Sequence, residues 1–403
     1  MNISDLFIKR PVMTSLVMLA VMLFGVFAYR LLPVNDLPSI DFPTIQVRSN
    51  LPGASPETMA SAVATPLERQ FSTIAGLDSM TSTNGQGISI ITLKFALERD
   101  IDAAAQDVQA AISMAARQLP QDMPSPPSYR KVNPADQPVL YLALSSPTLP
   151  LSDVNEFADT IIAPRVSMIS GVAQVLVYGS QKYAVRVQLD PQTLANRKIG
   201  IDEVSSALAR WNINLPTGGL QGDKQAFTIQ ATGQLYNAEA FKPMIVTYRE
   251  GSPVRLQDIA MVVDSVENDK IAAWYSSGGK STRAIVLAIQ RQPGTNTIEV
   301  VDSIKRQIPG FRSQLPGNVQ LNILFDRTES IRASVADVKF TLVLTIALVI
   351  LVIFLFLRNL SATVIPSLAL PLSIIGTFAA MYGLGFSVNN ITLMALTLSV
   401  GFV

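Results

Sequence analysis

Three long, charge-free apolar runs stand out in the hydrophobic pattern of the chain. The first, Val12–Tyr29, has about the length that a helix needs to cross the hydrocarbon core of a bilayer. The second, Phe340–Leu357, contains 15 residues that are Leu, Ile, Val or Phe. Together these residues favour membrane insertion by roughly 5–9 kcal/mol. The third, Ala362–Leu384, contains Pro366 and Pro371, which neighbouring helices can accommodate.

These runs predict transmembrane helices over residues 12–31, 339–358 and 362–384, with a fourth beginning at residues 391–403. Because about a dozen residues cannot cross a bilayer, we interpret the chain as an N-terminal fragment that stops inside a helix. A signal peptide is the alternative for the first run, since Lys9 and Arg10 precede it. The run is long for a signal core and no convincing small-residue cleavage site follows it, which favours an anchor.

The charges beside the apolar runs predict the orientation of the chain. Lys9, Arg10 and Arg358 flank short segments and belong in the cytoplasm by the positive-inside rule. Alternation then places residues 32–339 on the periplasmic side of the membrane. Apolar residues at helical spacing within residues 1–11 predict a short helix that lies in the membrane interface.

Between the first two runs, short strands alternate with helices. We predict a strand, a helix, two strands and a helix at Ile45–Val47, Pro56–Ile74, Ser79–Thr83, Ile88–Phe95 and Asp102–Leu119. The same order returns at Val139–Leu144, Leu151–Ile169, Val172–Tyr178, Ala184–Leu189 and Asp202–Trp211. Gly76 and Gly171 lie 95 residues apart, and each follows the first helix of its set. Helices often end at a glycine, because glycine readily adopts positive φ. The repeat predicts duplicated βαβ-type units packed as small α/β sandwiches.

A glycine-rich stretch, Asn214–Asp223, follows the second set and precedes a strand predicted at Phe227–Thr232. Its spacing matches no phosphate-binding loop, so we reject nucleotide binding. The pattern alone favours a flexible hairpin tip, and an arm that reaches a neighbouring subunit is the functional alternative. Strands at Ala284–Gln290 and Gln320–Leu324 and a helix at Thr297–Leu315 complete this part of the chain.

The composition narrows the possible chemistry. The 403 residues contain neither Cys nor His, which excludes thiol nucleophiles, thiolate metal sites and histidine as a general base within this chain. A formal charge of +1 gives no reason to expect a nucleic-acid partner. The scattered methionines at 59, 80, 114 and 123 form no ladder, and we assign them to the core rather than to a soft-metal relay. We expect no metal and no cofactor.

Short strings distributed over the whole chain carry a family resemblance. They are Phe7–Val12, Leu51–Glu57, Asp326–Arg327, Phe354–Asn359, Ala362–Pro366, Gly376–Ala379, Gly385–Asn390 and Leu393–Thr397. In these strings the chain resembles the hydrophobe/amphiphile-efflux branch of the resistance-nodulation-division (RND) family, the AcrB-like pumps. It looks closest to the MdtB/MdtC-like pair of subunits, which form mixed trimers.

The resemblance implies a membrane α-helical bundle plus a large periplasmic α+β region. This region would consist of repeated βαβ, ferredoxin-like porter subdomains and an inserted docking subdomain. Porter subdomain 1 would span residues 37–131, porter subdomain 2 residues 132–179 and 267–330, and the docking subdomain residues 180–266. The docking subdomain would carry an arm at residues 214–223 that threads into the adjacent protomer, which reverses the preference for a hairpin tip. The residues assigned to the arm are Leu215, Pro216, Gly218, Gly219 and Leu220.

The resemblance also implies a substrate site and a proton pathway. Candidate substrate contacts are Tyr178, Phe325, Trp274, Leu176, Val177, Ser180 and Asn268. Aromatic and apolar walls suit broad specificity, although the same side chains could instead fill the core of a porter subdomain. The departure from the AcrB-like pattern at Val132–Pro138 points to a different substrate range. Because the four apolar runs contain no Asp, Glu, Lys or Arg, the proton-relay aspartates are expected just beyond Val403.

The implied function is an inner-membrane permease subunit that exports amphiphilic drugs or toxic compounds by proton antiport, and not an enzyme. The implied partners are membrane lipid, a periplasmic adaptor (membrane fusion) protein, an outer-membrane channel and a related subunit in a homo- or hetero-trimer. One alternative is an RND-related membrane factor that assists export or envelope assembly. Another is an enzyme with a periplasmic catalytic domain, for which the sequence offers no acid–base constellation.

Overall fold

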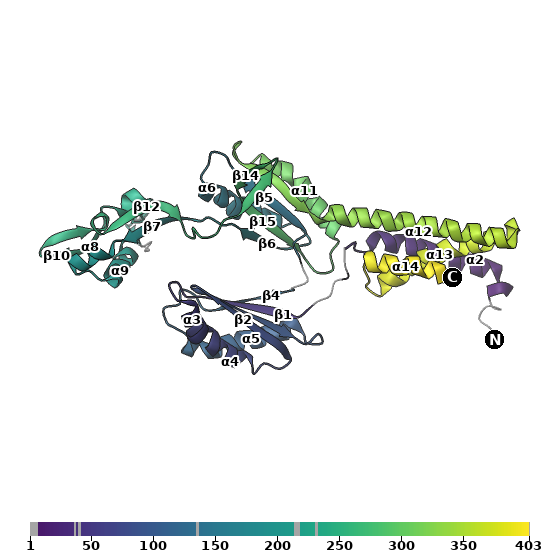
Figure 1. Ribbon diagram of the computed structural model, residues 1–403, viewed down its shortest axis with the longest axis horizontal. Helices are drawn as coiled ribbons and strands as arrows, with labels where there is room; N and C mark the ends of the chain where they lie inside the picture. Colours follow the sequence, from purple (N-terminus) through teal and green to yellow (C-terminus); the bar gives the residue numbers. More distant parts are fainter. Residues whose placement is uncertain are drawn as a thin grey trace.

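A computed structural model describes residues 7–35, 38, 42–133, 137–212, 218–229 and 233–402. The molecule is elongated, with the apolar helices gathered at one end and three α/β units beyond them (Figure 1). We call these the first unit (residues 42–133), the second unit (residues 137–179 and 268–326) and the inserted unit (residues 180–267). The inserted unit lies at the end of the molecule opposite the apolar helices (Figure 1).

The first unit is a four-stranded antiparallel sheet with helices on one face. Its elements are β1 (Thr44–Asn50), α3 (Pro56–Thr58), the π-helical turn η1 (Met59–Ala64), α4 (Thr65–Phe71), β2 (Leu77–Gly85), β3 (Ile88–Phe95), α5 (Ile101–Ala115), the 3₁₀ turn η2 (Ala116–Gln118) and β4 (Ser128–Val132). The strands lie in the order β2-β3-β1-β4. Apolar side chains at alternate positions of β1 and β3 pack against α4 and α5, because alternate residues of a strand share a face.

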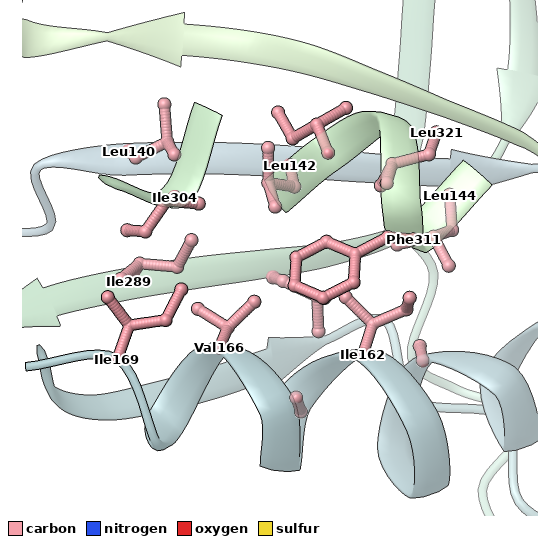
Figure 2. Packing of buried hydrophobic residues seen from close by; sticks show 14 of the residues in the cluster. Leu140, Leu142, Leu144, Ile162, Val166, Ile169, Ile289, Ile304, Phe311 and Leu321 are labelled. Atoms are coloured by element: carbon pink, nitrogen blue, oxygen red, sulfur yellow. The ribbon is translucent and has the colours of Figure 1, made fainter. Parts of the chain in front are cut away.

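The second unit repeats this arrangement. Its elements are β5 (Leu140–Ser145), α6 (Leu151–Glu156), the π-helical turn η3 (Phe157–Ile162), α7 (Ala163–Ser167), β6 (Val172–Tyr178), β15 (Ile285–Arg291), α11 (Thr297–Arg312) and β16 (Gln320–Asp326). The strands lie in the order β16-β5-β15-β6. Figure 2 shows the core between sheet and helices, where Phe311 of α11 lies among aliphatic side chains such as Leu142 and Ile162.

Both units therefore run strand–helix–strand–strand–helix–strand, with the first strand placed between the third and the fourth. In the first unit, a tight turn at residues 86–87 joins the second strand to the third. In the second unit, residues 179–284 separate β6 from β15. These residues include the inserted unit and a hairpin of β13 (Trp274–Ser277) and β14 (Lys280–Arg283).

The sequence-based assignment of two repeat members is wrong. β7 (Tyr183–Leu189) pairs with β12 (Ala260–Val266), and α9 (Ile201–Trp211) packs in the core of the inserted unit. The third strand and second helix of the second unit are instead β15 and α11. Local periodicity identifies a strand but does not say which sheet it joins, so it does not reveal the insertion after β6. The two predicted helix-ending glycines are confirmed, since Gly76 and Gly171 have φ of 78° and 87°.

The inserted unit has its own small apolar core. Besides β7, α9 and β12 it contains α8 (Pro191–Arg197), β8 (Gly219–Gln221), β9 (Ala226–Thr228), α10 (Ala238–Phe241), β10 (Ile245–Arg249), β11 (Ser252–Arg255) and the 3₁₀ turn η4 (Leu256–Asp258). Residues 230–232, the end of the predicted strand Phe227–Thr232, lie outside the described residues.

Within the described residues, three helices have the length and composition of membrane-spanning segments: α2 (Pro11–Leu31), α12 (Arg327–Leu357) and α13 (Leu360–Gly383). A shorter apolar helix, α14 (Asn390–Phe402), follows. The interfacial helix predicted at residues 1–11 lies largely outside the described residues. α2 and α13 approach closely at Gly25, where a Cβ would lie 2.0 Å from the Ile375 carbonyl oxygen. The absence of a side chain at Gly25 lets the two helix backbones meet.

α12 is longer than the predicted span of residues 339–358. A helix of 31 residues measures about 46 Å, against a hydrocarbon core of about 30 Å. The N-terminal part of α12 therefore extends beyond the length of a membrane span to the second unit, where it follows β16 directly (Figure 1).

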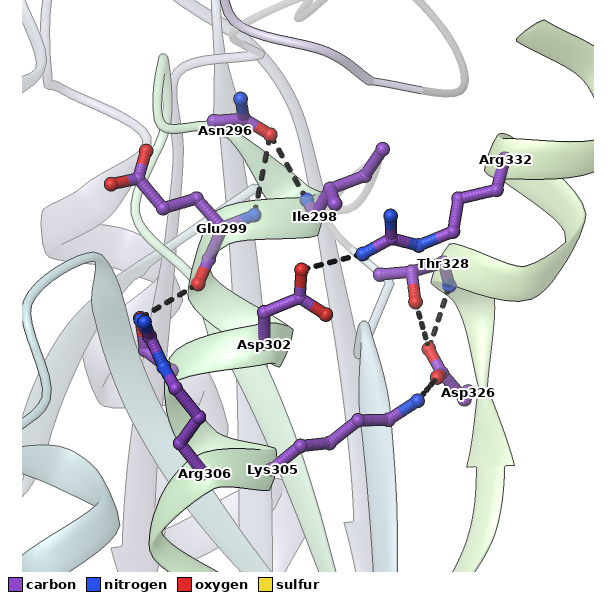
Figure 3. A network of polar contacts seen from close by, with 10 residues as sticks. Asn296, Ile298, Glu299, Asp302, Lys305, Arg306, Asp326, Thr328 and Arg332 are labelled. Carbon is purple, nitrogen blue, oxygen red and sulfur yellow. Dashed lines mark hydrogen bonds and ion pairs between the residues drawn. The ribbon is translucent and has the colours of Figure 1, made fainter. Parts of the chain in front are cut away.

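A polar network fastens α12 to α11 (Figure 3). Asp326, the last residue of β16, caps α12 by accepting hydrogen bonds from the Thr328 amide (2.8 Å) and hydroxyl (2.7 Å). Its carboxylate also forms an ion pair with Lys305 of α11. One turn into α12, Arg332 forms an ion pair with Asp302 of α11 (2.5 Å). We call Asp302, Lys305, Asp326, Thr328 and Arg332 the α11–α12 network.

Replacing Gly171 by Ala should destabilise the protein more than replacing Gly53 by Ala. Both glycines have a φ of +87°, where an L side chain is strained by about 1–3 kcal/mol. A Cβ at Gly171 would also lie 2.5 Å from Val300 Cγ2, whereas nothing lies within 4 Å of a Cβ at Gly53. Thermal unfolding of the purified protein measures both changes. Equal melting temperatures for Gly171→Ala and Gly53→Ala would contradict a role for the Val300 contact.

The contribution of the α11–α12 network to stability should be lost in acid. Burial raises the pKa of the Asp326 carboxyl, but the bonds from Lys305 and Thr328 outweigh burial, so this pKa lies below its ordinary value of 3.8. A depressed carboxyl pKa stabilises the fold above the unfolded-state pKa, and this gain disappears as the pH falls through the folded-state pKa. Below about pH 4, we expect the melting temperature of the wild type to fall more steeply than that of Asp326→Asn. The exposed Asp122→Asn serves as the control and should keep the wild-type slope; a wild-type slope in Asp326→Asn would refute this role.

Candidate functional site

The sheet of the second unit is covered by its helices on one face. Leu140, Leu142 and Leu144 of β5 point into the core beneath these helices. Their neighbours Tyr141 and Ala143 therefore lie on the opposite face, since side chains alternate along a strand. We call this opposite face the open face. Its apolar residues are Tyr141, Ala143, Leu176, Tyr178, Val286, Ala288 and Phe325, and Gln174, Gln290 and Asn322 lie on the same face.

Aromatic side chains stand at both edges of the open face. Phe325 on the edge strand β16 meets Tyr141 edge-on, with ring centroids 6.1 Å apart. Tyr178 lies on the other edge strand, β6, which is three strand spacings, or about 14 Å, from the strand that carries Phe325. Tyr178 and Phe325 are 49% and 52% exposed, whereas Ala143 and Ala288 between them are buried. The face is thus a broad apolar band with exposed aromatic rings, and not a closed pocket.

A cleft of about 920 Å³ adjoins the β6 edge of the open face. Leu176 and Tyr178 of the second unit contribute to one wall, and residues of the first unit form the other. On the first unit's wall, Arg130 donates a hydrogen bond to Gln46 Oε1 (2.6 Å), and Arg99 forms an ion pair with Asp107 (2.5 Å). The cleft therefore offers aromatic and aliphatic surface opposite amide and guanidinium groups. Its volume falls in the range that small-molecule sites occupy.

Trp274 belongs to the β13–β14 hairpin, which lies next to the end of β6. Gly179 follows Tyr178 with a φ of +70°, and a Cβ at this position would lie 2.6 Å from Ala273 Cβ. Only glycine permits this approach, which brings the backbone before Trp274 against the backbone after Tyr178. The Trp274 side chain itself is 62% exposed.

The remaining sequence-predicted contacts lie elsewhere. Val177 points away from the open face and packs against the helix-covered core. Ser180 and Asn268 lie where the chain crosses to and from the inserted unit. Their carbonyl oxygens accept hydrogen bonds from Gln181 Nε2 at 3.4 and 3.1 Å. The structure thus brings Tyr178, Leu176 and the Trp274 hairpin together, places Phe325 at the far edge of the same face, and separates Val177 from all of them.

Sequence reasoning missed two contributors to this region. Tyr141 could have been found from the alternation of its strand, in which the leucines at 140, 142 and 144 point to one side. Gln181 carries no such signal. It is 3% exposed, its backbone amide donates to Asn155 Oδ1 (3.2 Å), and its side-chain amide donates to the Ile271 carbonyl (2.7 Å). These contacts fix the crossover beside Tyr178, and they join residues far apart in the chain.

The predicted arm is described in part. Leu215 and Pro216 lie outside the described residues, whereas Gly218 (φ +73°) leads into the β8–β9 hairpin. Within the hairpin, Leu220 pairs with Phe227. Both side chains are more than 60% exposed, at 63% and 61%. These two exposed apolar side chains therefore lie next to each other on the hairpin.

Comparison with known families agrees with this architecture. The family model described as AcrB/AcrD/AcrF matches residues 3–403, which is nearly the whole chain. Members of this family are RND-type transporters of the inner membrane, and the three long apolar helices are consistent with such a protein. The chain therefore belongs to the AcrB/AcrD/AcrF family of transporters.

Proposed function

We propose that this chain forms part of the permease of a tripartite, proton-driven efflux pump that exports amphiphilic drugs or toxic compounds. The observation that carries this proposal is the open face with its adjoining cleft. An amphiphile would lay its apolar part on Leu176 and Tyr178, and its polar part would meet Gln46 and Arg130 across the cleft. Such adaptable contacts favour many related molecules rather than one shape.

The strand order supports the assignment of subdomains. Both four-stranded units have the ferredoxin-like order, which suits porter subdomains 1 (residues 37–131) and 2 (residues 132–179 and 267–330). The inserted unit would then be the docking subdomain (residues 180–266), and its exposed β8–β9 hairpin would contact a neighbouring protomer in a homo- or hetero-trimer of the MdtB/MdtC-like branch. A periplasmic adaptor and an outer-membrane channel would complete the pump.

The driving force would come from the membrane part of the complete transporter. An ionisable group at membrane depth can convert a proton gradient into a conformational bias. The apolar runs of this chain contain no Asp, Glu, Lys or Arg that could serve as such a group.

Substitution of the exposed aromatics should alter substrate preference. In the complete pump, Tyr178→Ala and Phe325→Ala remove apolar contact area and should reduce resistance to some amphiphiles at least fourfold while leaving trimers intact. Tyr248→Ala is the matched control, because Tyr248 is also exposed (62%) but lies on the inserted unit. The measurement is growth inhibition over a panel of amphiphiles, together with native-gel analysis of the purified protein. Resistance profiles that match the wild type in both variants would count against the site.

The proposed orientation can be tested by labelling of single cysteines, since this chain contains none. Ser313 lies on the second unit, and Leu360 is the first residue of α13. In a background without other cysteines, a membrane-impermeant maleimide should label Ser313→Cys in intact spheroplasts. It should label Leu360→Cys only after the membrane is permeabilised. The opposite pattern would invert the topology and remove the basis for efflux.

A further inference from the structure

The segment that follows α2 is hydrogen-bonded on both sides. On one side it forms a parallel bridge: the Asn35 amide donates to the Val388 carbonyl (3.1 Å), and the Val388 amide donates to the Pro33 carbonyl (2.9 Å). On the other side, the Thr297 amide donates to the Val34 carbonyl (3.3 Å). Thr297 is the first residue of α11, and Val388 lies two residues before α14. We call Pro33–Asn35, Thr297 and Val388 the Asn35 joint, because it links α14 to α11.

The side chain of Asn35 fixes the geometry of this joint. It is 2% exposed, and three oxygens surround one end of its side-chain amide: the Val34 carbonyl (2.9 Å), the Thr297 hydroxyl (2.8 Å) and the Thr295 carbonyl (3.2 Å). We assign Nδ2 to this end, because only the nitrogen can donate to these acceptors. Hydrogen bonds are directional, and a buried polar group left without a partner costs about 1–3 kcal/mol. The joint therefore resists sliding more than an apolar contact of the same size would.

The α14 side of the joint is also rigid. Asn389 and Thr392 bond reciprocally: the Thr392 amide donates to Asn389 Oδ1 (3.0 Å), and the Asn389 amide donates to Thr392 Oγ1 (2.9 Å). Val388 is 1% exposed and belongs to an apolar cluster with Leu32 and Leu393. A displacement of α14 therefore carries Val388 with it.

α11 is thus held at two points by different apolar helices. The Asn35 joint holds Thr297, and the α11–α12 network holds Lys305, eight residues further (305 − 297 = 8) and about 12 Å along the helix. A shift of about 1–2 Å between α14 and α12 would tilt α11 by about 5–10°. Because Ile304 and Phe311 of α11 are buried in the core beneath the sheet, this tilt would reach the open face.

We propose that Asn35 is a positioning residue of the transport cycle: the Asn35 joint stays closed and passes displacements of α14 to the N-terminal end of α11. This proposal rests on the proposed transport function and adds a second connection between membrane and sheet, besides the direct continuation of β16 into α12. It places Asn35 and Thr297 among the residues that control transport rate, although neither belongs to the open face or its cleft.

The first test replaces the amide donor of Asn35 by a carboxylate oxygen of nearly the same shape, which also places a negative charge in the joint. In the complete transporter, Asn35→Asp should lower the maximal transport rate at least fivefold with KM within twofold of the wild type. Asn318→Asp is the matched control, because Asn318 Nδ2 also donates to a threonine hydroxyl, that of Thr148 (2.9 Å), but is exposed on the second unit. Thr297→Val should resemble Asn35→Asp, whereas Thr297→Ser keeps the hydroxyl and should retain the wild-type rate. A wild-type rate in Asn35→Asp would overturn the proposal.

The second test asks whether the joint stays closed. Val34 and Val388 face each other in the bridge, so Val34→Cys with Val388→Cys should form a disulfide on oxidation. Transport should then remain at half or more of the rate measured after reduction. Arrest of transport on oxidation, with recovery on reduction, would mean that the joint opens and would overturn the proposal.

A third readout does not depend on transport. Spin labels at Gln307→Cys on α11 and Ile391→Cys on α14 of the reconstituted transporter should give one narrow distance distribution. Asn35→Asp should broaden this distribution and Asn318→Asp should not. If the wild type transported no amphiphile but Asn35→Asp broadened the distribution, the role of Asn35 in holding α14 to α11 would be supported and the efflux proposal would fail. An unchanged distribution in Asn35→Asp would overturn the joint itself.

Discussion

The arrangement depends on a sheet whose own helices cover one face. In the second unit, α6, α7 and α11 bury the side chains that point to their side, and the alternating pattern sends Tyr141, Leu176 and Tyr178 to the other. A strand cannot turn a single residue to the opposite face without a bulge or a shift in register, so the aromatic face follows directly from the packed one. The register of β16 shifts in this way between Ile323 and Phe325. As a result, the Phe325 side chain lies on the open face beside Tyr141.

Two units with the same strand order differ in the connection between their second and third strands. In the first unit a tight turn joins these two strands directly. In the second unit the inserted unit and the β13–β14 hairpin lie between them. Gly179 permits the close return of the chain, and Gln181 bonds the outgoing strand to the returning one. The insertion therefore begins and ends beside Tyr178, so the inserted unit and the open face share one junction.

Much of the fold could be predicted from local patterns. The bounds of β3 and β6 match the predicted strands, and the glycines that end the first helices adopt positive φ in both units. The π-helical turns were not predicted. Pro66 and Pro164 lack an amide donor inside a helix, and each follows a turn in which an amide bonds five residues back, at Thr65 to Ala60 and at Ala163 to Ala158. These wider turns accommodate a proline that a regular helix would exclude.

The candidate site was harder to predict, because its geometry arises between distant residues. Alternation could separate Val177 from Leu176 and Tyr178, but it could not show that Phe325 lies across the same sheet. The same limit applies to α12, whose charged start at Arg327–Lys339 gave no sign that the helix continues to the second unit. Two ion pairs hold the start of α12 there, Lys305 with Asp326 and Arg332 with Asp302. Each joins α11 to residues more than 20 positions further along the chain, so a local pattern does not reveal them.

The central claim is that the open face, and not the helix-covered face, binds amphiphiles. Photo-cross-linking of the complete transporter with an amphiphilic diazirine probe, followed by peptide mapping, tests it most directly. The account predicts labels on β6 and β16, around Tyr178 and Phe325, that an excess of unlabelled amphiphile removes. Competable labels confined to the outer faces of α7 and α11, or no competable label on either edge strand, would contradict it.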